Sequence, residues 1–417
     1  MKTILKRDKS VVAFDQSKIT NAIHKAGKET KEFDYAKAQE LSDNVQQLIE
    51  ARDIKLEVEN IQDLVEEVLL NSEYKQTAKA YILYREKRHQ DRKPDIFKAR
   101  LTLKPYEYPD LLDYVDAIRE SYWIHTEFNY TADIQDFKVN ATEVEKNAIK
   151  NAMIAIAQVE VAVKTFWGDL YHRMPKSELG SVGYTFAESE VRHHDAYSHL
   201  LEVLGLNNEF EKIKDIPELM QRVNYLNRAT HTAKSGDDRD YALALLLFSL
   251  FIEHVSLFSQ FLIIMAFNKH KQMFKGISNA IEATSKEEQI HGLFGIELIN
   301  IIKDENPEWF DETMAQEVYE ACRHSYESES LVIDWIYEKG DLDFMPKETV
   351  KEFVKNRLNN SLESVGYERI FEVDEKAVLD TDWFDDEVVA TKHVDFLNKR
   401  SINYTKRSSS ITGDDLF

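Results

Sequence analysis

The chain of 417 residues contains few of the residues that interrupt helices. It has 12 glycines and 7 prolines, well below the roughly 7% and 5% of average proteins. This scarcity argues against collagen-like folds, turn-rich β folds and disorder along most of the chain. The length allows two or three folding units of roughly 150 residues each. The composition therefore predicts a mainly α-helical protein with a sizeable buried core.

Cysteine and net positive charge are also scarce. The one cysteine, Cys322, cannot form an intrachain disulfide or a CxxC redox pair, so any dithiol chemistry must come from another protein. The formal charge of −22 opposes binding to a nucleic-acid backbone. Four of the first ten residues are basic, which is not typical of a signal peptide. We therefore expect a cytoplasmic protein that does not bind nucleic acid.

One apolar segment, residues 241–267, is long enough to cross a bilayer. However, Glu253, His254 and Gln260 lie near its middle, and an ionised side chain costs a few kcal/mol in hydrocarbon. A helix that is apolar on all sides also fits the interior of a helical bundle. We therefore predict a buried core helix and no membrane association.

Charge divides the chain into two parts. Residues 1–95 carry 18 basic and 18 acidic residues, so the whole net charge of −22 lies in the remainder. Residues 89–97 are polar and contain a proline, as is typical of a domain boundary. In the first part, residues 3–15 predict two short strands around a tight turn, with Asp15 as the N-cap of the helix that follows. Four helices are expected to begin at Gln16, Tyr35, Val58 and Tyr74.

Four helical segments of the second part each place a glutamate on an apolar stripe. Two of these glutamates have a histidine three residues later, in the sequences Glu190-Val-Arg-His193 and Glu288-Gln-Ile-His291. Residues at i and i+3 are neighbours on a helix, and a buried carboxylate is costly unless it is paired, protonated or bound to a metal. The pattern therefore predicts one shared metal site, formed by Glu160, Glu190, His193, Glu253, Glu288 and His291.

Four glutamates and two histidines are the ligands of carboxylate-bridged dimetal bundles, and this ligand set suits iron or manganese. One ExxH pair arises often by chance, but two pairs, each preceded by an inward glutamate, are specific. The bundle alone fits iron storage, peroxide handling, hydroxylation or radical generation. Tyr197, four residues after His193, is either an ordinary core tyrosine or a phenol that can lose an electron to the metals.

Two stretches near the N-terminus resemble the opening and closing segments of an ATP-cone domain. They are KRDKSVVAFDQSKITNAI at residues 6–23, and VEEVLL with YKQTAKAYILYREKR within residues 65–88. The resemblance implies a small α+β regulatory domain over residues 1–92, with a hairpin and four helices, that binds ATP or dATP. The nucleotide and phosphate candidates that it implies are Lys6, Arg7, Lys18 and Lys87. Lys9 stands where this family usually has a glycine in the hairpin turn.

The remainder of the chain resembles the radical-generating small subunit of class I ribonucleotide reductase. The matching stretches are ESYWIHTEF at 120–128, ESEVRHHDAYSHLL at 188–201, FIEHVSLFSQF at 251–261 and KEEQIHG at 286–292. This resemblance implies a ferritin-like bundle over residues 98–390 with the six metal ligands named above. It implies that Tyr197 occupies the radical position, and that Trp123 relays the electron hole. Glu287 stands in place of the aspartate that usually assists this relay by hydrogen bonding.

The C-terminal segment, residues 399–417, is polar and rich in serine, as is typical of a peptide that orders on a partner. By the resemblance, residues 391–417 form a flexible tail that docks on the catalytic large subunit, and Tyr404 passes the hole across that interface. We expect a homodimer that forms larger assemblies in response to ATP or dATP.

The resemblance implies that a dimetal centre stores a one-electron oxidant and passes it to a cysteine of the large subunit, which reduces ribonucleotides to deoxyribonucleotides. In iron-tyrosyl members of this family the first carboxylate ligand is commonly an aspartate, whereas all four are glutamates here. Iron, manganese and a mixed pair therefore all stay open. Two alternatives also stay open. The chain could be a stand-alone ferritin-like dimetal oxidase, or a nucleotide-gated metal-binding assembly module.

Overall fold

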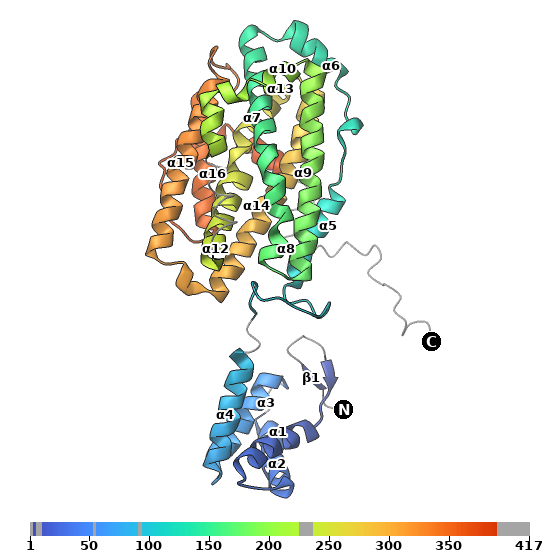
Figure 1. The fold of residues 1–417 in the computed structure, drawn as a ribbon, viewed down its shortest axis with the longest axis vertical. Coiled ribbons are helices and arrows are strands. Elements are labelled where there is room, and N and C mark those ends of the chain that lie inside the picture. Colours follow the sequence, from blue (N-terminus) through green and yellow to red (C-terminus); the bar gives the residue numbers. More distant parts are fainter. Residues whose placement is uncertain (1–2, 6–10, 53–55, 91–93, 225–236, 390–417) are drawn as a thin grey trace, which may run out of the picture. The chain divides into compact units, whose positions relative to one another are not determined.

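The computed structural model describes residues 3–5, 11–52, 56–90, 94–224 and 237–389, without the side chains of residues 87–90, 160–164, 210 and 389. The chain divides into two compact units, Met1–Pro94 and Asp95–Phe417. Each unit has a hydrophobic core of its own. Both are built mainly of helices (Figure 1), so the predicted fold class is confirmed.

The first unit contains a two-stranded antiparallel sheet and four helices. Strand β1 (Thr3–Leu5) pairs with β2 (Val11–Ala13), and the turn between them, with Lys9, lies outside the described residues. The helices are α1 (Ser17–Thr30), α2 (Tyr35–Ala51), α3 (Val58–Asn71) and α4 (Lys75–Gln90). Each begins within one residue of its predicted start. Asp15 accepts a hydrogen bond from the Ser17 backbone N–H at 3.0 Å, although the N-cap position itself is Gln16.

The second unit is a bundle of long helices joined by short ones. Its α-helices are α5 (Leu112–Glu120), α6 (Thr131–Gln135), α7 (Glu143–Gly168), α8 (Leu170–Arg173), α9 (Ser177–Leu204), α10 (Asn207–Phe210), α12 (Asp238–Leu247), α13 (Phe258–Lys271), α14 (Lys275–Glu305), α15 (Glu312–Ile336), α16 (Lys347–Ser364), α17 (Glu375–Leu379) and α18 (Asp382–Val389). Its 3-10 helices are η1 (Pro109–Leu111), η2 (His125–Glu127), η4 (Ile213–Asp215) and η6 (Pro307–Trp309). Two segments, η3 (Asp136–Asn140) and η5 (Phe248–Ser256), are π-helices.

Helices α7, α9 and α14 form the centre of the bundle and pack lengthwise against their neighbours (Figure 1). Helix α7 begins with a capping box, in which Thr142 and Glu145 satisfy each other's backbone N–H groups. Helix α9 ends at Gly205, whose φ of 73° is the left-handed conformation that glycine adopts without strain. These signals position the two helices whose apolar stripes carry three of the six predicted ligands.

The apolar segment predicted to be a core helix is α12, η5 and α13 in succession. Among the described residues it is the one stretch long and apolar enough to span a membrane, and 94% of its most apolar window is buried inside the unit. Burial on all sides confirms that it is a core helix. Its middle, η5, is wound as a π-helix and contains Glu253; such segments are frequent at functional sites.

Candidate metal centre

Three elements bring four of the predicted ligands together. Glu190 from α9, Glu253 from η5, and Glu288 with His291 from α14 offer ligand atoms that all lie within 4.8 Å of one another. All four side chains are buried. Glu160 belongs to α7, which packs along α9, but its side chain is among those that the structure does not describe.

His193 is buried beside this cluster, and both histidines direct the same ring nitrogen into it. The Nδ1 atom of His193 lies 2.9 Å from Glu288 and 3.4 Å from Glu190. The Nδ1 atom of His291 lies 2.9 Å from Glu190, 3.3 Å from Glu288 and 3.7 Å from Glu253. The sequence predicted the two histidines and left open which nitrogen faces the site.

The outer nitrogen of each histidine has its own polar partner. His193 Nε2 lies 2.8 Å from Glu287 Oε2, and His291 Nε2 lies 2.9 Å from the Ser189 hydroxyl. Partners of this kind fix the orientation of a ring and leave the inner nitrogen available to a metal. Glu253 is held similarly, because the Trp167 indole N–H donates to its Oε1 atom at 2.9 Å.

The carboxylates and imidazoles perturb one another strongly. Burial by itself lowers the pKa of a histidine. The carboxylates around each ring nevertheless raise the pKa of His193 and of His291 well above the ordinary value. Glu190 and Glu288 act on both rings, Glu287 also acts on His193, and Glu253 also acts on His291. Burial, together with the charges of Glu288 and Glu190, raises the pKa of Glu253. For Glu288 the two imidazoles outweigh burial and lower its pKa. The cluster therefore attracts positive charge.

These donors fit metal ions. Both carboxylate oxygens of Glu190 and of Glu288 are buried, and within the described part of the chain they accept no hydrogen bond of regular geometry. The Nδ1 atoms of His193 and His291 are likewise buried and form no hydrogen bond of regular geometry with the described residues. Buried polar groups left in this way are costly unless a ligand satisfies them. Carboxylate oxygens and imidazole nitrogens in this number are donors that iron and manganese accept.

Two of the predicted relay residues, Trp123 and Glu287, lie against His193 at the edge of the cluster. Trp123 is 4% exposed, and its ring stacks on that of His193 with centroids 6.0 Å apart and planes at 20°. Glu287 is fully buried and contacts His193, but its other oxygen lies 3.2 Å from Arg192 Nη1. The Trp123 Nε1 atom is buried without a hydrogen-bond partner among the described residues. Glu287 is thus connected to the histidine and not to the indole nitrogen.

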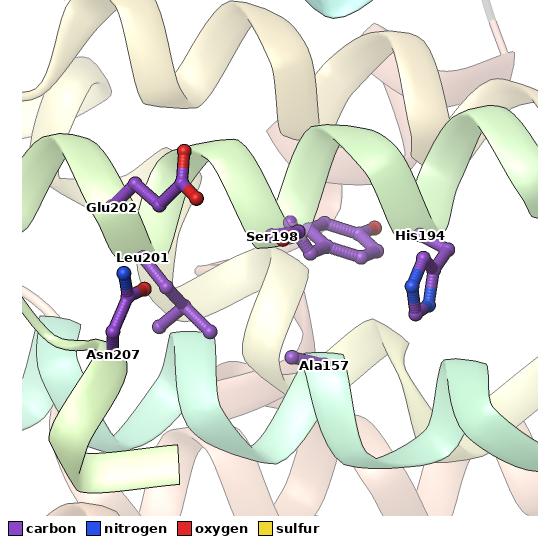
Figure 2. Close-up of a pocket in the computed structure, with 7 residues that line it drawn as sticks. Ala157, His194, Ser198, Leu201, Glu202 and Asn207 are labelled. Atoms are coloured by element: carbon purple, nitrogen blue, oxygen red, sulfur yellow. The ribbon is translucent and has the colours of Figure 1, made fainter.

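Tyr197 is 3% exposed and borders a partly open cavity between α7 and α9, shown in Figure 2. The cavity has a volume of about 280 Å³ and is lined by Ala157, His194, Tyr197, Ser198, Leu201, Glu202 and Asn207. Its polar lining comes mainly from α9 side chains (Figure 2). A small molecule therefore has room next to this tyrosine.

Of the four predicted nucleotide residues, the structure describes the side chain of Lys18 alone. Lys18 is exposed on α1. Lys6 and Arg7 lie outside the described residues, and Lys87 lies in α4 with a side chain that is not described. Tyr404 and the rest of the tail also lie outside the described residues. The nucleotide site and the tail stay predictions.

Sequence reasoning missed three supporting residues. Trp167 lies seven residues after Glu160 on the same apolar stripe, so its spacing was a usable signal. Ser189, next to Glu190, carried no signal. Arg192 lies inside the first ExxH motif, where a charged residue would ordinarily be expected to face solvent, but it is 6% exposed.

Two family matches divide the chain at nearly the same place as its compact units. Residues 100–377 match the family "Ribonucleotide reductase, small chain", and residues 2–90 match "ATP cone domain". The chain belongs to the ribonucleotide reductase small-chain family. Both resemblances drawn from the sequence are thereby confirmed, and with them the prediction of a ribonucleoside-diphosphate reductase small subunit. Proteins of this family work with a large catalytic subunit.

Relatives with known names and structures agree with this family. The chain is 26% identical over 330 residues to the probable ribonucleoside-diphosphate reductase small subunit of Invertebrate iridescent virus 3, a match covering 76% of this chain and 86% of the viral protein. The ribonucleotide reductase R2 subunit from Clostridium botulinum has a TM-score of 0.62 at 16% identity, covering 68% of this chain and 89% of that one. The dimanganese(II)-NrdF protein of Streptococcus sanguinis has a TM-score of 0.59 at 16% identity, covering 68% and 97%. At such identities the two structures establish the shared ferritin-like fold alone.

Proposed function

We propose that this chain is the radical-generating subunit of a ribonucleotide reductase and that ATP and dATP control it through its ATP-cone domain. The observation that carries the proposal is the buried cluster of Glu190, Glu253, Glu288 and His291, whose ligand atoms lie within 4.8 Å of one another. In a chain of the small-chain family, such a cluster supports a dimetal centre and the storage of an oxidant.

In this proposal, the six ligands hold two ions of iron or manganese: Glu160, Glu190, His193, Glu253, Glu288 and His291. When bound, the metals supply one-electron oxidising power, stored on the ions themselves or on Tyr197. The chain's own residues orient the ligands and keep the site dry. The ring centroids of Phe186 and His291 lie 4.2 Å apart. The rings of Trp167 and Phe294 pack against Phe186 and against each other.

The oxidising equivalent is proposed to leave through Trp123, assisted by Glu287, and then through Tyr404 to a cysteine of the large subunit. In this proposal residues 98–390 form the dimetal bundle, and residues 391–417 form the tail that docks on the large subunit. The stacking of Trp123 on His193 supports the first step. The single cysteine of this chain, buried Cys322, agrees with a division of labour in which the large subunit supplies the thiols.

Residues 1–92 are proposed to bind ATP or dATP through Lys6, Arg7, Lys18 and Lys87. Nucleotide binding would change how copies of the chain assemble, from a homodimer to a larger inactive form with dATP. We also expect a cytoplasmic location. The neutral net charge of this part of the chain repels a polyphosphate less than the acidic remainder does.

The proposal is tested by loading the purified chain with iron or with manganese, exposing it to oxygen, and recording low-temperature electron paramagnetic resonance. An oxidised signal should form and should be consumed when the large subunit and a ribonucleotide are added. If the oxidant is stored on Tyr197, Tyr197→Phe should remove the signal. If it is stored on the metal ions, the signal should persist in this variant. Trp123→Phe should preserve the signal and abolish ribonucleotide reduction.

Two outcomes would contradict the proposal. Turnover of a small molecule without the large subunit, unaffected by deleting residues 399–417, would identify a stand-alone oxidase. Unchanged function after Tyr197→Phe and Trp123→Phe would identify a metal-binding assembly module. For nucleotide control, the mass of the chain in solution should differ between ATP and dATP, and equal masses would contradict control by assembly.

A further inference from the structure

Arg192 is a buried guanidinium at the edge of the metal cluster, one residue before His193. Its Nη1 atom lies 3.2 Å from Glu287 Oε1 and 3.2 Å from the backbone carbonyl of Trp123. Its Nε atom donates to Glu188 at 3.0 Å. One side chain therefore contacts both residues to which the relay step is assigned.

The surroundings hold this arginine inside the protein. Its guanidinium carbon lies 4.5 Å from the centroid of the Tyr122 ring, a cation–π geometry that covers the charge on its outer side. Glu287, its buried anionic partner, is fully shielded from solvent. A buried ion pair is costly unless its geometry is good and its remaining polar atoms are bonded, and the Nη2 atom of Arg192 has no hydrogen-bond partner among the described residues. The cost of burying Arg192 implies that its position matters.

Arg192 also determines where the Glu287 carboxylate points. One oxygen of Glu287 contacts His193 Nε2 at 2.8 Å, and the other accepts from Arg192 at 3.2 Å and from the Ser121 hydroxyl at 3.3 Å. The Trp123 Nε1 atom has no hydrogen-bond partner among the residues described. The direct link from carboxylate to indole that the family resemblance implied is thus replaced by contacts through the guanidinium.

We propose that Arg192 is a positioning residue of the relay: it holds Glu287 on His193 and joins that pair to Trp123 through the Trp123 carbonyl. This inference rests on the relay assigned under the proposed function. A guanidinium suits the task because its planar fork can donate to several acceptors at once, whereas an ammonium is a single point of charge. One-electron oxidation of Trp123 would then leave the proton on its Nε1 atom, since no described acceptor lies there.

The first experiment concerns the metal-free chain and needs no radical. With tryptophan labelled with ¹⁵N, the indole N–H resonance of Trp123 is assigned by its loss in Trp123→Phe. In Arg192→Met, Glu287 loses its cationic partner and should turn to the indole, so the resonance should shift downfield and exchange more slowly with solvent. The matched control is Arg119→Met, since Arg119 is 69% exposed on α5, and it should change nothing. An unchanged Trp123 resonance in Arg192→Met would overturn the proposal.

A second variant covers the case in which Arg192→Met does not fold. Arg192→Lys keeps the positive charge but loses the Nε–H that donates to Glu188 at 3.0 Å, so the charge is no longer oriented as in the planar guanidinium. Its indole resonance should shift in the same direction by a smaller amount. If Arg192→Met does not fold and the indole resonance of Arg192→Lys equals that of the wild type, the orienting role given to the guanidinium is refuted.

The final experiment uses the metal-loaded chain. Arg192→Met should bind the same amount of metal and form the same oxidised signal as the wild type, but the signal should be consumed about tenfold more slowly with the large subunit and a ribonucleotide, as expected for the loss of one charge-assisted hydrogen bond. Equal rates would contradict the proposal. Failure of the proposed function is distinguishable, because then the wild type itself would show no signal or no consumption.

Discussion

At the scale of single residues, the cluster illustrates how burial and charge oppose each other. Glu253 is 1% exposed, and burial and the charges of Glu288 and Glu190 raise its pKa. Its contacts are the Trp167 indole N–H at 2.9 Å and a distant imidazole nitrogen at 3.7 Å. A site built to bind cations stores unfavourable electrostatic energy when no cation is bound.

Glu253→Gln should therefore stabilise the metal-free protein while weakening metal binding. The amide keeps the shape and can still accept from Trp167, but it removes one buried acid, so the thermal midpoint without metal should rise by a few degrees. Addition of manganese should raise the midpoint of the wild type more than that of the variant. Differential scanning calorimetry with chelator and with metal measures both effects. A lower midpoint in the metal-free variant would refute this account.

Trp167→Phe should weaken metal binding without removing a ligand. The phenyl ring keeps most of the aromatic packing, but Glu253 loses the donor that orients it. Loss of such an outer hydrogen bond typically costs tenfold or more in metal affinity, which competition with a chelator can measure. Trp383→Phe, on α18, is the matched control. Equal affinities for both variants would show that Glu253 is held without Trp167.

At the scale of elements, the segment of residues 96–108 at the start of the second unit contacts α9 and α14, the two helices that carry the ExxH motifs. Arg100 forms a buried ion pair with Glu178 at 2.6 Å near the start of α9. Near the end of α14, Glu305 accepts hydrogen bonds from the Ile96 backbone N–H at 2.8 Å and from the Tyr108 hydroxyl at 2.5 Å. These contacts secure one end of each helix and so support the ligands farther along.

Glu178 makes the stability of this anchor depend on pH. Burial alone would raise its pKa, but hydrogen bonds from Arg100 and from the backbone lower it from the ordinary 4.5 to about 2. A pKa that is lower in the folded state stabilises the fold above the unfolded pKa, and this stabilisation is lost as the pH falls from about 4.5 toward 2. At neutral pH it amounts to at most about 3 kcal/mol.

Glu178→Gln should accordingly lower the free energy of unfolding at pH 7, and the difference from the wild type should shrink below about pH 4.5. Denaturant unfolding across this pH range measures the difference. Glu202→Gln on the same helix is the control, because its side chain is 60% exposed and should have little effect at any pH. A difference that stays constant down to pH 3 would contradict the role given to the Glu178 charge.

At the scale of the whole molecule, each of the two compact units has a core of its own, so the functions proposed for the two units should be separable. A chain that begins at Asp95 should fold, bind metal with the stoichiometry of the full chain and lose every response to ATP and dATP. Metal analysis and mass measurement with each nucleotide test this. A truncated chain that still changed mass with dATP would place nucleotide control in the bundle.

The sequence by itself determined the fold class, the starts of the four helices in the first unit and the identity of the metal-ligand candidates. These features are local: apolar residues at helical spacing define a buried face, and ExxH places two donors on that face through helix geometry alone. The same logic predicted that the apolar segment is a core helix, because its glutamate and histidine would be costly in a membrane.

Only the tertiary structure decided how those donors are oriented. The π-helical winding around Glu253, the inward Nδ1 atoms of both histidines and the burial of Arg192 depend on side chains from other helices and loops. The sequence of α9 suggests a solvent-facing Arg192, because it does not show that Tyr122, Trp123 and Glu287 surround that position. Spacing along one helix specifies which residues share a face, while packing between elements determines what each of them touches.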